Sequence, residues 1–318
     1  MFLPIRIKQP TIKRDVIMNS IKYITVIAVL FMFAFSSTAQ EKPEGTEKEG
    51  KITPILWEDG VENAYPRWSN DGTKILYQSN RTGRWQIYIM DKDGSNKKRV
   101  TIDKYNNNFP DWSPDNKQIA FVSDRKGNED VYVMNIDGSG LKNLSNNPAR
   151  DIHPYWSPDG EKILFNSSRD DEESFEVYQV NVDRTGLKRL TNTDEVETCA
   201  RFSPDGKKIV YLKGTPGGND EVCVMKSDGT DEKDLTKSDS NEGWPVWTPD
   251  GNQIIYSSTW FGQFSLLSMN ADGSDMKRIS IPKAPYYDAR ASVSPDGKEI
   301  VFNRQAEGTI GIYILELE

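Results

Sequence analysis

Six copies of a motif of the form Trp-Ser-Pro-Asp-Gly follow one another along the chain and constrain its fold more than any other feature. Successive copies begin 44, 44, 46, 45 and 46 residues apart. A period in the forties with four strand-like runs per unit is typical of the blades of a β-propeller. The sequence therefore predicts an all-β repeat fold. The copies begin at Trp68, Trp112, Trp156, Phe202, Trp247 and Val293.

The second copy indicates the order of strands within a unit. Runs rich in β-branched and aromatic residues predict strands at 109–113, 118–123, 131–136 and 141–145. Asp137-Gly138 lies between the third and fourth runs, and similar Asp-Gly pairs recur in other copies. Because both residues of such a pair tolerate positive φ, we expect a tight hairpin there.

The two ends of the array indicate how it closes. The sixth copy stops after its third strand, at 312–316, whereas Leu56 precedes Trp68 by 12 residues, as Val100 precedes Trp112. Residues 52–57 therefore have the spacing of a fourth strand. We expect them to complete the last blade and close a monomeric six-bladed propeller over residues 52–318, since closure removes an exposed sheet edge.

The segment before the array has the pattern of an export signal. An apolar run at 24–35 follows Lys22 and precedes Ser37-Thr38-Ala39. This order of basic, apolar and small residues predicts a cleaved signal peptide over residues 1–39 and a periplasmic or secreted protein. The run is too short to span a bilayer as a helix, so no membrane span is expected after cleavage. Residues 40–51 contain no large apolar side chain and are predicted to be a disordered linker.

The charge of the chain argues against two classes of partner. Residues 1–39 carry a net charge of +4, which leaves −12 on the remainder of a chain whose total is −8. An acidic chain without a basic cluster lacks the electrostatic features that bind nucleic acid or anionic lipid. Cys199 and Cys223 fall on the first and third strands of one unit, too far apart for a disulfide, so we expect two free, buried thiols.

One polar position recurs five residues before each motif and is a candidate binding site. If the first strand of every blade lines the channel, these side chains would form a ring at its mouth. Such a ring could hold a basic peptide or, through oxygen ligands, a Ca²⁺ ion. Alternatively, each oxygen accepts backbone hydrogen bonds at the start of its strand. The six residues are Asn63, Asn107, Asp151, Glu197, Glu242 and Asp288.

Two residues further on, each copy carries a second candidate position. It holds Tyr65, Phe109, His153, Cys199, Trp244 and Arg290. Aromatic residues and Arg often anchor protein partners, so all but Cys199 are candidate anchors; packing between blades is the alternative. His153 is the only histidine and hence a single candidate base. The sequence contains neither a Gly-x-Ser-x-Gly elbow nor Cys/His zinc spacing, and we assign no catalytic residue.

The succession of motifs in 131–134, 137–145 and 153–169 resembles the WD40-like repeats of the TolB family. The resemblance covers residues 52–318. It implies a periplasmic propeller that binds an envelope protein such as the lipoprotein Pal within the Tol–Pal complex. TolB proteins carry an α/β domain before the propeller, and residues 40–51 are too few to form one.

Two classes of function remain open from the sequence. We favour a protein-binding scaffold in the cell envelope. The alternative is a propeller that acts on an envelope or extracellular polymer, either as a carbohydrate-active enzyme or with a peptidase. Among 48 Asp and Glu residues a catalytic carboxylate pair is compatible with the sequence.

Overall fold

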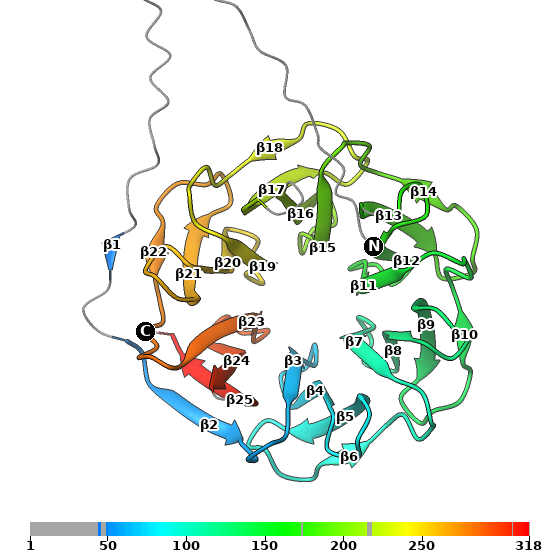
Figure 1. Ribbon diagram of the computed structural model, residues 1–318, viewed down its shortest axis with the longest axis horizontal. Helices are drawn as coiled ribbons and strands as arrows, with labels where there is room; N and C mark the ends of the chain where they lie inside the picture. Colours follow the sequence, from blue (N-terminus) through cyan, green and yellow to red (C-terminus); the bar gives the residue numbers. More distant parts are fainter. Residues whose placement is uncertain (1–43, 46–48, 173, 215–217, 307, 318) are drawn as a thin grey trace, which may run out of the picture. The chain divides into compact units, whose positions relative to one another are not determined.

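The computed structural model describes residues 44–45, 49–172, 174–214, 218–306 and 308–317 (Figure 1). The predicted signal segment and part of the predicted linker lie outside the described residues. All regular structure in the described ranges is β, so no helix there could cross a membrane. Six sheets stand around a central axis, which confirms the predicted six-bladed propeller (Figure 1).

Each blade is one antiparallel sheet whose first strand lies nearest the axis (Figure 1). Blade 1 contains β3 (Asn63–Trp68), β4 (Lys74–Ser79), β5 (Gln86–Asp91) and β6 (Lys98–Arg99). Blade 2 contains β7 (Asn107–Trp112), β8 (Gln118–Ser123), β9 (Asp130–Asn135) and β10 (Lys142–Asn143). Blade 3 contains β11 (Asp151–Trp156), β12 (Lys162–Ser167), β13 (Glu176–Asn181) and β14 (Lys188–Arg189).

The remaining blades follow the same order. Blade 4 contains β15 (Val196–Phe202), β16 (Lys208–Gly214), β17 (Asp220–Lys226) and β18 (Lys233–Asp234). Blade 5 contains β19 (Glu242–Trp247), β20 (Gln253–Ser258), β21 (Ser265–Asn270) and β22 (Lys277–Arg278). Blade 6 contains β23 (Tyr287–Val293), β24 (Glu299–Ala306), β25 (Thr309–Glu316) and the N-terminal strand β2 (Ile52–Leu56).

Strand β2 closes the ring, as the sequence predicted. It pairs antiparallel with β25, Ile52 opposite Leu315 and Leu56 opposite Ile312. A short strand β1 (Glu44–Gly45) pairs in parallel with β22, and Glu49 accepts a hydrogen bond from the Ile281 amide at 2.7 Å. These described residues of segment 40–51 therefore contact blades 5 and 6.

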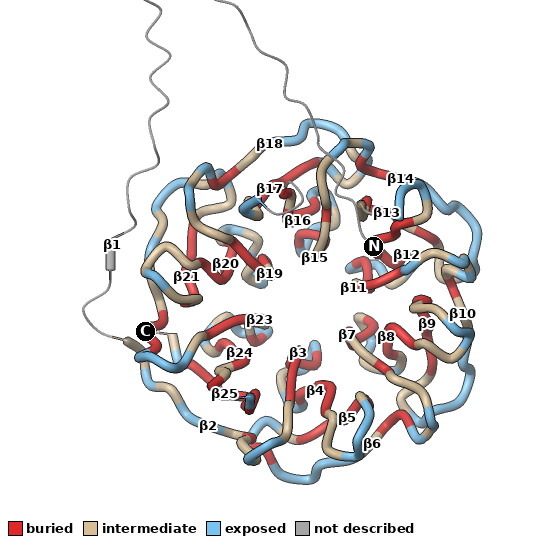
Figure 2. Tube along the Cα trace, viewed as in Figure 1, coloured by how far each residue is buried: buried red, intermediate tan, exposed pale blue. Residues whose placement is uncertain are grey.

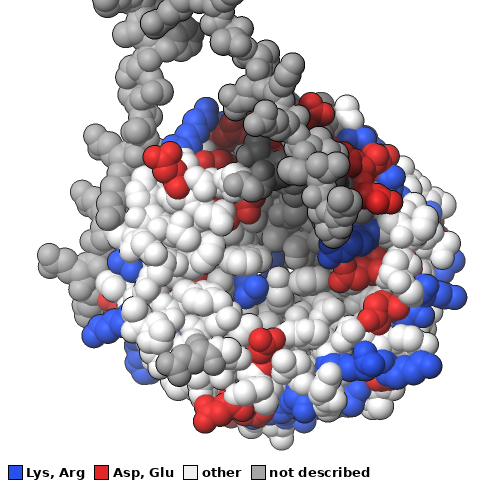
Figure 3. Space-filling view, in the orientation of Figure 1, with Lys and Arg blue, Asp and Glu red and all other residues white. Residues whose placement is uncertain are grey.

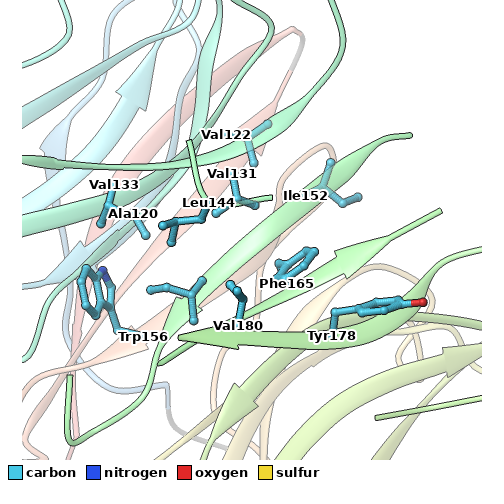
Figure 4. Close-up of a cluster of buried hydrophobic side chains, with 11 residues drawn as sticks. Ala120, Val122, Val131, Val133, Leu144, Ile152, Trp156, Phe165, Tyr178 and Val180 are labelled. Carbon is cyan, nitrogen blue, oxygen red and sulfur yellow. The ribbon is translucent and has the colours of Figure 1, made fainter. Parts of the chain in front are cut away.

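The hydrophobic core lies between neighbouring blades. Figure 2 shows buried residues through the inner strands and exposed residues mainly at the outer edge. One cluster joins Ala120 and Val131 of blade 2 to Trp156 and Phe165 of blade 3 (Figure 4). Trp68, Trp112 and Trp247 occupy equivalent clusters, so the first residue of the motif packs between blades as expected. Cys199 and Cys223 are both free and buried, which confirms that prediction.

The rest of the motif forms the turn after the first strand. In blade 1, the Gly72 amide donates to the Ser69 carbonyl at 2.9 Å, and the Ser69 hydroxyl donates to Asp71 at 2.6 Å. Residue 72 has a φ of +69°, a left-handed conformation that glycine adopts without steric cost. The second copy has Asn116 there, at a φ of +58°, and asparagine is the residue that best replaces glycine in this region.

Two glycines with the same backbone conformation provide a test of how β2 is seated. Gly83 and Gly94 have φ of +82° and +83°, but a Cβ on Gly94 would lie 2.4 Å from the Ile55 carbonyl oxygen, whereas a Cβ on Gly83 would meet nothing within 4 Å. We expect Gly83→Ala to cost about 1 kcal/mol of unfolding free energy from backbone strain alone. Gly94→Ala should cost roughly 1–3 kcal/mol more, because β2 must move. Equal losses in urea unfolding would contradict the observed position of β2.

Candidate binding site in the central channel

A β-bulge recurs in all six first strands and determines which side chains enter the channel. In β3 the pairing register with β4 shifts between Ala64 and Arg67, and the other five first strands shift at the same place. The bulged residue has a φ between +46° and +59° in every blade. These residues are Tyr65, Phe109, His153, Cys199, Trp244 and Arg290.

Polar side chains of the neighbouring blade hold several of these bulges in place. The Tyr65 amide donates to Asn303 at 2.9 Å, the Phe109 amide to Gln78 at 2.7 Å, and the Cys199 amide to Asn166 at 3.0 Å. A bulky residue in the left-handed region is costly by about 1–3 kcal/mol unless its surroundings fix it there. Blade-to-blade hydrogen bonds therefore position the channel side chains.

The six bulged residues contact one another around the axis and close the channel; we call them the channel plug. The ring of Phe109 lies 4.8 Å from that of Tyr65 and 4.4 Å from that of His153, centroid to centroid. Arg290 lies over the rings of Tyr65 and Trp244 at 4.7 and 4.4 Å, and Cys199 packs in the same cluster as Trp244. The sequence-predicted partner anchors thus contact each other inside the propeller. This position agrees better with a role in packing between the blades than with a role as exposed anchors for a protein partner.

His153 is neutral in this plug. Burial, with Arg201, Arg290 and Arg67 nearby, lowers the pKa of its imidazole to about 3. Its Nδ1 lies 3.8 Å from the sulfur of Cys199. Burial also raises the pKa of the Cys199 thiol, so neither group is ionised near pH 7. The pair lacks the thiolate that nucleophilic catalysis requires.

The six motif turns surround a cavity on one side of the plug, which we call the motif-face cavity. The motif face consists of residues 69–72, 113–116, 157–160, 203–206, 248–251 and 294–297. The turns lie close to one another, because a Cβ on Gly160 would be 3.7 Å from Pro114 and one on Gly206 would be 4.0 Å from Pro158. The cavity has a volume of about 330 Å³ and is lined by the Trp-Ser-Pro portions of the repeats. Between the plug and its neighbours a void of only about 20 Å³ remains.

The residues that precede three of the six motifs contribute the charge of this cavity. Arg67, Asp111 and Arg201 line it and are each less than a tenth exposed. Arg67 Nε lies 3.9 Å from Asp111 Oδ1, and the Trp156 amide donates to Asp111 Oδ2 at 2.9 Å. Burial, and then the charge of Arg201, lowers the pKa of Arg67 to about 9, while burial raises that of Asp111 to about 6. Two cations thus face one carboxylate.

Comparison with known families identifies the repeat. The family described as TolB beta propeller domain matches residues 103–217 and 213–318, together more than half of the chain. The chain belongs to the TolB β-propeller family.

Solved structures with this fold include TolB from Acinetobacter baumannii, with a TM-score of 0.56 and 24% identity over 72% of this chain and 57% of that one. A TolB structure from Agrobacterium tumefaciens has a TM-score of 0.66 and 20% sequence identity, and the match covers 84% of this chain and 97% of that one. An oligogalacturonate lyase from Vibrio parahaemolyticus has a TM-score of 0.59 and 12% sequence identity, and the match covers 86% of this chain and 95% of that one. These likenesses show the fold alone. No curated protein is significantly similar in sequence.

In this TolB-family propeller the predicted polar ring does not line the channel. All six side chains are at most 1% exposed. Asn63, Asn107 and Asp151 each accept a hydrogen bond from an arginine of the same blade at 3.0–3.1 Å, and Arg304 donates to Asp288 at 2.7 and 2.9 Å. The prediction of a ring at the channel mouth is therefore wrong in location. These oxygens accept hydrogen bonds within the blades, as the alternative interpretation proposed. The donors given above are arginine side chains rather than backbone amides.

The bulge explains the misplacement. Asn63 pairs with Ser79 and Trp68 with Ile75, and partners four residues apart lie on one face of a strand. Asn63 therefore shares the face of Trp68, toward the blade interior. In a regular strand it would share the face of Arg67, which lines the cavity.

Glu197 and Glu242 differ from the other four because the described part of the TolB-family fold holds no ion pair for either. Glu197 accepts from Thr193 at 2.5 Å and Glu242 from Ser238 at 3.2 Å, while Oε2 of each is buried without a partner. Burial raises the pKa of both carboxyls to about 7, and Glu176 and Glu221 add smaller repulsions.

The channel of the TolB-family propeller does not fit the Ca²⁺ ion considered from the sequence. Arg290 lies in the plug, and Arg67 and Arg201 outnumber Asp111 in the cavity. Ca²⁺ requires six to eight oxygen ligands, most often with several carboxylates. Within the described ranges, no three His, Cys, Asp or Glu residues cluster in a way that could hold a metal.

Sequence reasoning missed Arg67, Asp111 and Arg201. The available signal was a charged residue directly before a core aromatic, at Arg67-Trp68, Asp111-Trp112 and Arg201-Phe202. Such a residue must lie on the opposite face of the strand from the aromatic side chain.

Proposed function

We propose that this protein is an exported TolB-family propeller that binds a cell-envelope protein, such as a Pal-like lipoprotein, at its motif face. Family membership supports a binding role for the propeller. The apolar run at 24–35 with its flanking residues supports export. On the part of the surface that Figure 3 leaves visible, acidic and basic side chains are interspersed, in keeping with a partner other than nucleic acid.

The observation that carries the proposal is the motif-face cavity. The channel plug lies at the inner end of this cavity, so the cavity is closed at that end and does not continue through the channel. Its volume of about 330 Å³ falls at the lower end of ligand pockets, which suits a short inserted segment. Exposed prolines, including Pro158, Pro204 and Pro249, form its rim, and four tryptophans are among the residues that line it. Aromatic residues and arginine are enriched at protein interfaces, and both line this cavity.

Rim substitutions should abolish partner capture. Full-length protein with a C-terminal affinity tag would be produced with Pro158→Glu and Pro249→Glu together, and envelope proteins retained by it would be identified by mass spectrometry. Two charges at the entrance must lose water when a partner docks, and we expect at least a roughly tenfold loss of the specific partner.

The matched control is Arg84→Glu with Lys126→Glu, two exposed residues in the loops between second and third strands, away from the motif turns. It should capture the partner as the unaltered protein does. A partner retained equally by the rim variant would place binding elsewhere. If no envelope protein is captured and the pure protein turns over an envelope or extracellular polymer, the enzymatic alternative would replace the proposal.

A further inference from the structure

The arginines of the motif-face cavity are incompletely satisfied. Arg67 Nη1 donates to the Pro66 carbonyl at 3.1 Å and to that of Ala291 at 3.5 Å, but its buried Nε has no hydrogen-bond partner. Arg201 lies over the ring of Tyr155 at 5.3 Å, and within the described residues its guanidinium has no hydrogen-bond acceptor. Buried guanidinium groups normally use most of their five donors. Donors are therefore left for a ligand.

The charge of the cavity indicates the sign and valence of that ligand. Arg67, Arg201 and Asp111 are the charged groups among the residues that line it, so the cavity carries one net positive charge. An uncompensated charge in a buried site is costly, and one monovalent anion would neutralise it. The planar fork of arginine matches a carboxylate. A phosphate dianion would leave an excess negative charge instead.

We propose that Arg201 and Arg67 bind a carboxylate that a protein partner inserts into the motif-face cavity, from an Asp or Glu side chain or a chain terminus. This rests on the proposed function and names the chemical group that it recognises. Trp68, Trp112, Trp156 and Trp247 are among the residues that line the same cavity. Their side chains pack between the blades beside it, close enough for their fluorescence to respond to a bound segment.

The lining tryptophans also report binding. The probes are acetyl-Gly-Glu-Gly-amide, its Gln counterpart and glutarate, titrated at low salt while tryptophan fluorescence is recorded. We expect a saturable response to the Glu peptide, no response to the Gln peptide, and at least about tenfold weaker binding to Arg201→Gln, since hydrogen bonds between charged groups are strong. Arg84→Gln is the control and should bind normally. Equal binding of the two peptides, or undiminished binding by Arg201→Gln, would overturn the inference, as would a response to glutarate alone.

Stability separates a ligand-binding arginine from a structural one. Arg201 repels Arg67 and attracts Asp111, and these two effects oppose each other. Arg201→Gln should therefore change the melting temperature of the ligand-free protein little, despite the lost contact with Tyr155. A fall of several degrees would indicate a structural role and contradict the inference. If the rim substitutions abolish partner capture while Arg201→Gln retains it, the proposed function stands and the carboxylate site fails.

Discussion

Deletion of residues 52–57 is expected to remove the soluble monomer, the largest effect that the structure predicts. The deletion strips β2 from β25, a strand of eight residues whose edge then becomes open. It also removes Leu56 from the cluster that joins blade 6 to Trp68 and Tyr77 of blade 1. An open hydrophobic edge invites pairing between chains, so we expect aggregation and a melting temperature lower by more than about ten degrees.

A pair of point substitutions controls for the change in chain length. Leu56→Asp places a charge in the core between blades, whereas Thr53→Asp changes an exposed residue of the same strand. Light scattering and thermal unfolding should show that Leu56→Asp, like the deletion, aggregates and melts at a lower temperature. Thr53→Asp should change neither property appreciably. A soluble, monomeric deletion variant with unchanged melting would contradict closure by β2.

Glu242→Gln is expected to stabilise the protein above pH 8. Burial raises the pKa of Glu242 from 4.5 to about 7 in the fold. The folded state therefore binds the proton more tightly than the unfolded state, and stability falls as the pH rises from about 4.5 to about 7. At 1.36 kcal/mol per pKa unit, the neutral amide should gain up to about 3 kcal/mol at pH 8.5. At pH 5 the carboxyl is protonated in the folded state but still largely ionised in the unfolded state, so the gain should fall to about 0.8 kcal/mol.

The equivalent carboxylate in blade 6 is the control. Arg304 donates two hydrogen bonds to Asp288, so Asp288→Asn leaves a largely buried cation without its closest anionic partner and should destabilise at both pH values. Urea unfolding at pH 5 and pH 8.5 measures both variants. A Glu242→Gln protein that is less stable than the unaltered one at pH 8.5 would contradict the burial of an ionised, unpaired carboxylate.

The blade count and the closing strand followed from the sequence because they depend on spacing. The 12-residue interval from Leu56 to Trp68 is repeated elsewhere in the chain, and period alone then placed β2 beside β25. The same reasoning identified the positions of Asn63 and Tyr65 as special, but it assigned the wrong roles. A one-residue bulge reverses which side chains share a face, and no residue type marks it, since Tyr, Phe, His, Cys, Trp and Arg all adopt its positive φ.

The charges of the cavity depend on contacts between blades, which single-strand patterns do not contain. Arg67 meets Asp111 across blades 1 and 2, and Arg201 lowers the pKa of Arg67 from blade 4. Glu242 is distinguished from Asp288 only by the absence of an arginine beside it. Such differences arise from which side chain the neighbouring strand presents. They became visible only with the assembled ring.

Site-specific photo-crosslinking would show whether a protein partner docks on the motif face. A photoreactive residue would replace Asn70, an exposed member of the cavity rim, or Arg84, in a loop away from the motif turns. We expect one envelope protein to be crosslinked in cells from position 70 and not from position 84. Arg201→Gln should reduce the amount of the crosslinked product. Crosslinking of the same protein from position 84 alone would contradict it.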